Sequence, residues 1–209
     1  MYYNLNAVVL GRTELREDDL LVTVYSEEKG KVILQARGAK KILSKLAGHL
    51  EPVSLSALNV TVGKHIDHLI GADIVKSYTK IKSNLEFTAY ANYFIELTDK
   101  LTKENHRDTS VFNLLERSLD YLDQKADNLV IARICFGYKL LHLLGYNPME
   151  KGILKDEIGN IIMSPIAGII DSKPILSNLA RLNKVLDNEL EECLEQELKT
   201  KQFLKTLHV

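Results

Sequence analysis

Residues 20–36 read LLVTVYSEEKGKVILQA, and this stretch decides the first half of the fold. Residues 20–25 are rich in β-branched and aromatic side chains, which favour a strand. The charged run 26–30 supplies a turn, and the apolar run 31–36 follows it as a second strand. The sequence therefore predicts a β-hairpin.

Three further strands flank this hairpin. Short apolar or alternating runs occupy residues 7–11, 53–62 and 66–75, separated by glycine, asparagine and charged turns. Five short strands within roughly 75 residues are typical of an OB-type barrel. We therefore predict an OB-fold domain over residues 1–79.

Beyond Lys80 the apolar period changes from two to 3.6, which indicates helices. Residues 87–101 carry one apolar helix face, Asp108 offers an N-cap for a second helix, and residues 128–144 form a third that ends at Gly145. The predicted class is α+β, with the barrel followed by an all-helical domain over residues 80–209.

Two later segments are harder to interpret. Residues 146–173 hold several glycines and prolines, so we expect a loop with a small hairpin whose turn lies at residues 156–160. Ser172, with Pro174 two residues later, can open a last helical stretch of one or two helices.

The composition excludes several classes of protein. The net charge of −1 gives no global field that would attract nucleic acid, so any such contact needs a local patch. No export signal and no apolar run long enough for a membrane span occur, and Cys135 and Cys193 lie far apart in helical patterns. We expect a soluble cytoplasmic protein without a disulfide. Nucleotide-loop, nucleophile-elbow and zinc-protease motifs are absent, which argues against an enzyme and against a cofactor.

The most informative stretch for function is residues 29–45, which holds six cations and no acidic residue among seventeen positions. Gly38 lets the chain turn after the third strand, so the basic side chains would fan out from the barrel rim. Without an acidic partner in the run, this patch suits backbone phosphates. The predicted DNA-binding residues are Arg12, Lys31, Arg37, Lys40, Lys41 and Lys45.

Other interpretations of these residues stay open. A solvated lysine-rich loop is nearly as common a reason for such a run. The acidic residues around Arg12, namely Glu14, Glu17, Asp18 and Asp19, favour pairing within their own loop and could less readily hold a metal ion. His65 and His68 fit turn or surface positions.

The chain closely resembles the RecO family. The resemblance covers almost the whole chain, with the family's order and spacing, and rests on VVLGR at 8–12, EDDLLVTVY at 17–25, GK at 30–31, ARGAKK at 36–41, SKL at 44–46, LEPV at 50–53, YFIEL at 93–97, LLHLLGYNP at 140–148 and LKTKQFL at 198–204. Membership implies an OB domain that binds single- and double-stranded DNA, anneals complementary strands and helps RecA loading in the RecF pathway of DNA repair. The implied partners are RecR and the single-strand-binding protein, with RecA engaged indirectly and no membrane, in a cytoplasmic, nucleoid-associated setting.

Two departures from the family pattern matter. Many members carry two CxxC pairs after the Leu-Gly-Tyr-x-Pro motif, yet residues 149–172 contain no cysteine, so we predict no zinc and expect Ile161, Ile162 and Ile169 to pack in its place. Relatives often have Arg ahead of Phe-Glu, where this chain has Cys135-Phe136-Gly137. Arg133 and Lys139 are therefore only weak candidates for partner binding.

The sequence thus favours a DNA-binding recombination mediator that works by charge neutralisation, with no catalytic residue and no metal. The alternative is a helical protein-interaction adaptor whose basic barrel docks an acidic protein partner. A metal-dependent nuclease using Asp18 and Asp19 is a distant third possibility.

Overall fold

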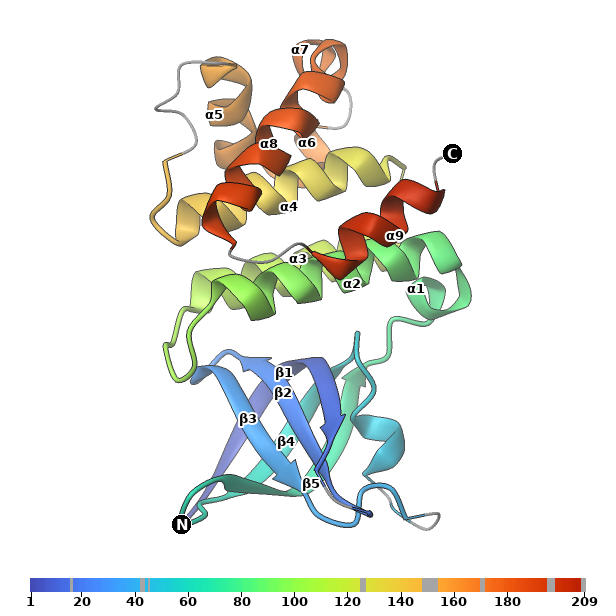
Figure 1. The fold of residues 1–209 in the computed structure, drawn as a ribbon, viewed down its shortest axis with the longest axis vertical. Coiled ribbons are helices and arrows are strands. Elements are labelled where there is room, and N and C mark those ends of the chain that lie inside the picture. The colour runs from blue at the N-terminus through green and yellow to red at the C-terminus, as the bar shows by residue number, and fades with distance from the viewer. Residues whose placement is uncertain are drawn as a thin grey trace. The chain divides into compact units, whose positions relative to one another are not determined.

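The N-terminal strands close into a barrel in the computed structural model, which describes residues 1–15, 17–41, 44, 46–124, 127–147, 154–169, 172–194 and 198–207. The ring order is β1-β2-β3-β5-β4 (Figure 1). Strand β3 pairs with β5 in parallel, and the other neighbouring strands of the ring pair antiparallel. The strands are β1 (Tyr2–Glu14), β2 (Leu20–Ser26), β3 (Gly30–Ala36), β4 (Leu55–Thr61) and β5 (Asp67–Lys76). The predicted α+β class with a five-stranded OB barrel is confirmed.

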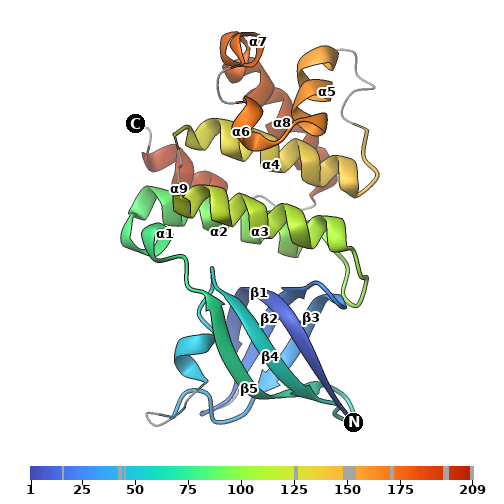
Figure 2. The ribbon, with the colours of Figure 1, turned by 180° about the vertical axis from the view of Figure 1, so that it is seen from behind.

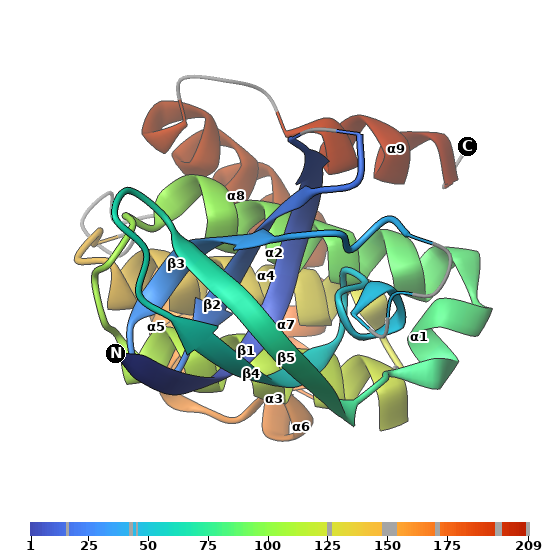
Figure 3. The ribbon, with the colours of Figure 1, turned by 90° about the horizontal axis from the view of Figure 1, so that it is seen from below.

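Strand β1 is longer than the predicted run 7–11 because its start pairs with β4 and its end with β2. Tyr2 pairs with Thr61, and the amide of Val62 donates to the carbonyl oxygen of Met1 at 3.0 Å. The N-terminus therefore lies beside the β4–β5 loop, as the view from below shows (Figure 3). A register shift between Val9 and Gly11 lets one strand serve both neighbours.

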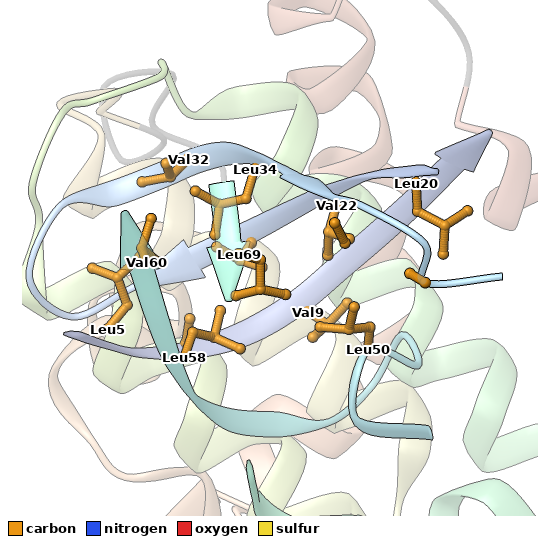
Figure 4. Packing of buried hydrophobic residues seen from close by; sticks show 14 residues of the cluster. Leu5, Val9, Leu20, Val22, Val32, Leu34, Leu50, Leu58, Val60 and Leu69 are labelled. Carbon is orange, nitrogen blue, oxygen red and sulfur yellow. The ribbon is translucent and has the colours of Figure 1, made fainter. Parts of the chain in front are cut away.

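The barrel interior is filled by aliphatic side chains from every strand. Because side chains alternate along a strand, every second residue points inward. The cluster includes Leu5, Val9, Val22, Leu34 and Leu58, each at most 2% exposed (Figure 4). Burying each such side chain contributes about 1.5–3 kcal/mol, so this packing fixes the ring and hence where the loops emerge.

Residues 104–105, which lie outside the strands, pair with the part of β3 that β5 does not reach. Strand β5 pairs with β3 only at residues 34–36, and at the other end the amide of Asn105 donates to the carbonyl oxygen of Lys31 at 2.8 Å. Lys31 also forms a parallel bridge with Glu104. Accordingly the chain divides into two compact units, Met1–Tyr78 with Thr102–Glu116, and Thr79–Leu101 with Arg117–Val209. The domain boundary between residues 79 and 80 stays a prediction.

Helix α4 (Leu129–Leu143) is the centre of the second unit. It contacts α2 (Leu85–Leu101), α5 (Lys155–Met163), α6 (Ile166–Ile169) and α8 (Leu179–Cys193), and most of its residues are buried (Figure 2). The remaining helices of this unit are α1 (Thr79–Ser83), α7 (Lys173–Ser177) and α9 (Lys199–Leu207), while α3 (Thr109–Gln124) is shared by both units. The helix that is apolar all round is thus a core helix, as predicted.

The predicted N-cap at Asp108, the predicted start of the third helix near Asn128 and its predicted end at Gly145 are confirmed. Asp108 Oδ1 accepts hydrogen bonds from the amides of Ser110 and Val111 at 2.8 and 3.2 Å. Asn128 Oδ1 accepts from the amide of Ile131 at 3.1 Å, and Gly145 follows α4 with φ of +87°. These short-range signals depend little on the rest of the fold.

The hairpin predicted within residues 146–173 is wrong. Residues 155–163 form α5, and α6 follows at residues 166–169, while 148–153 lie outside the described residues. Ile158 and Ile161, three positions apart, are both buried, which requires a helical period rather than a strand period. Ile161 and Ile169 are buried as expected and Ile162 is half-buried. The predicted final helical stretch forms two helices, α7 and α8, and α9 follows it.

Candidate nucleic-acid interface

Three cations of the basic run 29–45, namely Arg37, Lys40 and Lys41, lie in or next to the turn that follows β3. Residues 37–40 form the turn, Gly38 adopts φ of +63°, and the amide of Lys41 donates to the carbonyl oxygen of Gly38 at 3.2 Å. This positive φ suits glycine, and it reverses the chain immediately beyond Ala36. Arg37, Lys40 and Lys41 are therefore gathered at one end of β3, which we call the basic turn (residues 37–41).

The β1–β2 loop fastens the basic turn in place. Asp19 Oδ1 accepts a hydrogen bond from the Gly38 amide at 2.8 Å, and its Oδ2 accepts from Gln35 Nε2 at 3.0 Å. The amide of Lys40 donates to the carbonyl oxygen of Asp18 at 3.0 Å. Charge-assisted bonds to a carboxylate are stronger than neutral ones, so Asp19 fixes the turn's position.

Each lysine of the basic turn pairs with a carboxylate, one at the end of β1 and one in the β1–β2 loop. Lys40 Nζ lies 2.9 Å from Glu14 Oε1, and Lys41 Nζ lies 3.8 Å from Asp18 Oδ2. The expectation of an unpaired patch was therefore wrong, because the carboxylates come from a loop distant in sequence. The Lys41 side chain is 65% exposed and that of Lys40 is 32% exposed, and exposed pairs contribute only about 0–1 kcal/mol. Another anion can therefore exchange with these carboxylates.

Arg37 has a different neighbour, His68 at the start of β5. Its Nη2 lies 3.4 Å from His68 Nε2, and in the described part of the chain no carboxylate pairs with it. In the parallel register Gln35 lies opposite His68. Arg37 follows two residues after Gln35, so the side chains of Arg37 and His68 lie close together. Sequence reasoning assigned His68 to the turn or surface, since no local pattern reveals a contact between residues 31 positions apart.

Of the other three predicted DNA-binding residues, two have described positions, and neither is part of the basic turn. The strand β3 separates Lys31 from Arg37, a span of roughly 20 Å at about 3.3 Å per residue. Arg12 Nη2 lies 3.2 Å from Glu51 Oε1, so its predicted pairing within its own loop is wrong. Lys45 lies outside the described residues. The structure thus brings together three of the six residues.

The two weak candidates for partner binding make internal contacts. Arg133 is 7% exposed, donates to Asn183 and Asp187, and lies 4.8 Å from the Tyr93 ring. Lys139 Nζ donates to the carbonyl oxygens of Ile162 and Ser164 at 3.0 and 2.6 Å, at the C-terminal end of α5. Burial lowers the pKa of Lys139 from its ordinary value. Both cations therefore contribute to the helical unit's own structure.

Arg133 also lines a cavity of about 320 Å³ in the helical unit. Its wall combines apolar and charged side chains: Tyr90, Val130, Arg133, Asn183, Asp187, Lys201 and Leu204. Lys201 Nζ lies 3.3 Å from Asp187 Oδ2 and 2.7 Å from Glu191 Oε1. The cavity therefore has an apolar part and two cations, and both cations pair with Asp187.

The described residues contain no cluster of three or more histidine, cysteine, aspartate or glutamate side chains that could hold a metal ion. Cys135 is buried, and burial raises the pKa of its thiol to about 12. Within the same residues, none of the helices has the length and apolar character needed to cross a membrane.

Comparison with known proteins identifies the family to which the chain belongs. The family model described as "Recombination protein O N terminal" matches residues 1–78, and "Recombination protein O C terminal" matches residues 82–150. The chain belongs to the RecO family. It is similar to the DNA repair protein RecO of Bacillus mycoides strain KBAB4, with 33% identity over 148 residues. RecO proteins of Bacillus cereus strain AH187 and Bacillus anthracis are 31% identical over the same length.

These matches cover 71% of this chain but 59% of each RecO relative, so the chain spans about three fifths of the relatives' length. The predicted resemblance to the RecO family is confirmed.

Proposed function

We propose that this RecO family member is a DNA-binding recombination mediator that holds the phosphate backbone at the basic turn. The observation that carries this is the gathering of Arg37, Lys40 and Lys41 at one end of β3, fixed by Asp19. Because the backbone of the turn is already held in place, DNA binding does not have to order it. Lys31, Lys45 and Arg12 extend the contact if a strand follows β3 and the neighbouring loops.

The mechanism is electrostatic and involves no covalent step. Cations that neutralise phosphates release condensed counterions, which favours binding regardless of base sequence. Neutralisation also lowers the repulsion between two complementary strands, and this permits annealing. The protein then acts as a mediator rather than an enzyme, on both single- and double-stranded DNA.

The partners proposed from the family are RecR and the single-strand-binding protein, which together assist RecA loading. The cavity beside Arg133 supports a docking place for an acidic tail with apolar residues, because Val130 and Leu204 line it together with two cations. A tail carboxylate would compete with Asp187 for these cations. Lys201→Glu should weaken the binding of a labelled tail peptide several-fold in fluorescence anisotropy, and unchanged binding would remove this cavity from the proposal.

A mobility-shift titration across a salt series tests DNA binding. Three phosphate contacts correspond to a slope of log affinity against log salt of about −2 for single strands, and six to about −4. Charge reversal at Lys40 and Lys41 should weaken binding to all sequences alike, flatten the slope and slow annealing of labelled complementary strands. Loss that varied with base sequence would contradict backbone contact.

No DNA binding at low salt would favour the adaptor function instead. The contacts of Lys40 and Lys41 with carboxylates show that the basic turn accepts such groups, as an acidic protein partner would require.

A further inference from the structure

The carboxylates of Glu14 and Asp18 occupy positions that phosphate oxygens would need. Each carries the same sign of charge as a phosphate, and the 2.9 Å between Lys40 Nζ and Glu14 Oε1 is an ordinary distance for a charge-assisted hydrogen bond. Lys41 Nζ lies 3.8 Å from Asp18 Oδ2, within ion-pair range but not in hydrogen-bond contact. Each carboxylate therefore competes with a phosphate for the charge of its lysine.

Backbone hydrogen bonds keep the two carboxylates close to the basic turn. Glu14 is the last residue of β1, and the amide of Leu15 donates to the carbonyl oxygen of Asp19 at 3.1 Å. The Asp18 carbonyl oxygen accepts from the Lys40 amide, and the Asp19 carboxylate accepts from the Gly38 amide. The loop backbone therefore stays beside the turn when the carboxylate side chains swing away, because none of these bonds uses Glu14 or Asp18 side-chain oxygens.

We infer that Glu14 and Asp18 are built-in competitors of phosphate, which limit the affinity of the basic turn for DNA. This inference rests on the proposed function. A single small anion replaces one weak pair and gains little, whereas a nucleic-acid strand offers regularly spaced phosphates that replace both at once. Arg37 pairs with no carboxylate among the described residues, so its charge is open to a phosphate without this competition. The β1–β2 loop thus both positions the turn and restrains its binding to polyanions.

The test compares Glu14→Gln and Asp18→Asn with Glu17→Gln, using a labelled oligothymidine and fluorescence anisotropy at one fixed salt concentration. All three remove one negative charge from the same part of the chain, but the described residues show no ion pair at Glu17. Each of the first two should tighten binding about 2–5-fold, which converts to about 0.4–1 kcal/mol. The double variant should gain about 4–25-fold if the two pairs are independent. Glu17→Gln should change affinity less than either.

Double-mutant cycles then show whether each carboxylate acts through its own lysine. With Lys40→Gln in the background, Glu14→Gln should lose its gain while Asp18→Asn keeps it, and Lys41→Gln should have the opposite effect. The thermal unfolding midpoint should be unchanged in all variants, because the pairs are exposed.

The outcomes separate this inference from the proposed function. If the unaltered chain binds DNA and reversal of Lys40 and Lys41 weakens it, but Glu14→Gln and Asp18→Asn match Glu17→Gln, only the competition is wrong. If neither the unaltered chain nor the carboxylate variants bind DNA at low salt, the DNA-binding function itself is wrong.

Discussion

The two ends of strand β3 are held by different kinds of contact. At the Gly30 end, backbone packs on backbone, with the His106 carbonyl group against Gly30 and the Asn105 amide bonded to Lys31. At the Ala36 end, the basic turn is fixed by the Asp19 carboxylate and covered by exposed ion pairs. The first end cannot change without disturbing the fold, whereas the second can exchange one anion for another. The same strand is thus held rigidly at one end and carries exchangeable ion pairs at the other.

The largest effect is expected at the anchored end. In Gly30→Ala the new Cβ would lie 2.0 Å from the His106 carbonyl oxygen, at a backbone φ of +71°. We expect a loss of about 3 kcal/mol in the free energy of unfolding, from a left-handed backbone penalty of about 1 kcal/mol and overpacking of about 2 kcal/mol. Urea unfolding measures this loss. Gly48→Ala, with no heavy atom within 4 Å of the new Cβ, is the matched control.

Asp19→Ala should give a smaller loss of stability and a clear loss of binding. It removes the acceptor for the Gly38 amide and for Gln35 Nε2, which should cost about 1–2 kcal/mol. DNA affinity should fall several-fold although no cation is lost, because the turn is no longer fixed. Asp19→Asn keeps one oxygen acceptor and should recover part of the affinity. Equal binding by the Ala and Asn variants would show that the position of the turn does not matter.

Much of the barrel was predictable because each strand pattern is local. Residues 20–36 carry their own alternation and turn, and Asp108 and Asn128 cap helices that begin within three residues of them. The contacts of the basic turn were not predictable. They depend on the β1–β2 loop lying beside the turn, and Glu14 is 26 positions from Lys40 in the chain.

The error at residues 155–163 has a similar cause. Gly159 and Asn160 are common in turns, and sequence reasoning gave that tendency more weight than the spacing of Ile158 and Ile161. The α4–α5 contact buries both isoleucines, so tertiary packing outweighs the local turn preference.

The smallest effect concerns the hydrogen bond between Tyr3 and the Asp67 carboxylate at the end of the barrel. Tyr3 donates to Asp67 Oδ2 at 2.5 Å, and this bond lowers the pKa of Asp67 from its ordinary 3.8. A lowered carboxyl pKa stabilises the fold above the unfolded value, and this contribution is lost as pH falls through the folded value. Tyr3→Phe should therefore destabilise by less than about 1 kcal/mol at pH 7, allowing for solvent screening.

Urea midpoints of the unaltered chain and of Tyr3→Phe, measured from pH 7 downward, check this expectation. The difference between them should persist to about pH 4 and shrink below it, since 3.8 is the ordinary Asp value. A difference that stayed constant below pH 4 would mean that the tyrosine hydroxyl stabilises through another group.

The salt dependence of single-stranded DNA binding tests the role of the basic turn most directly. When Arg37, Lys40 and Lys41 are replaced together by glutamine, the slope of log affinity against log salt should become shallower by about 2, equally for several base sequences. A slope unchanged by the triple substitution would mean that DNA, if it binds at all, contacts another part of the protein.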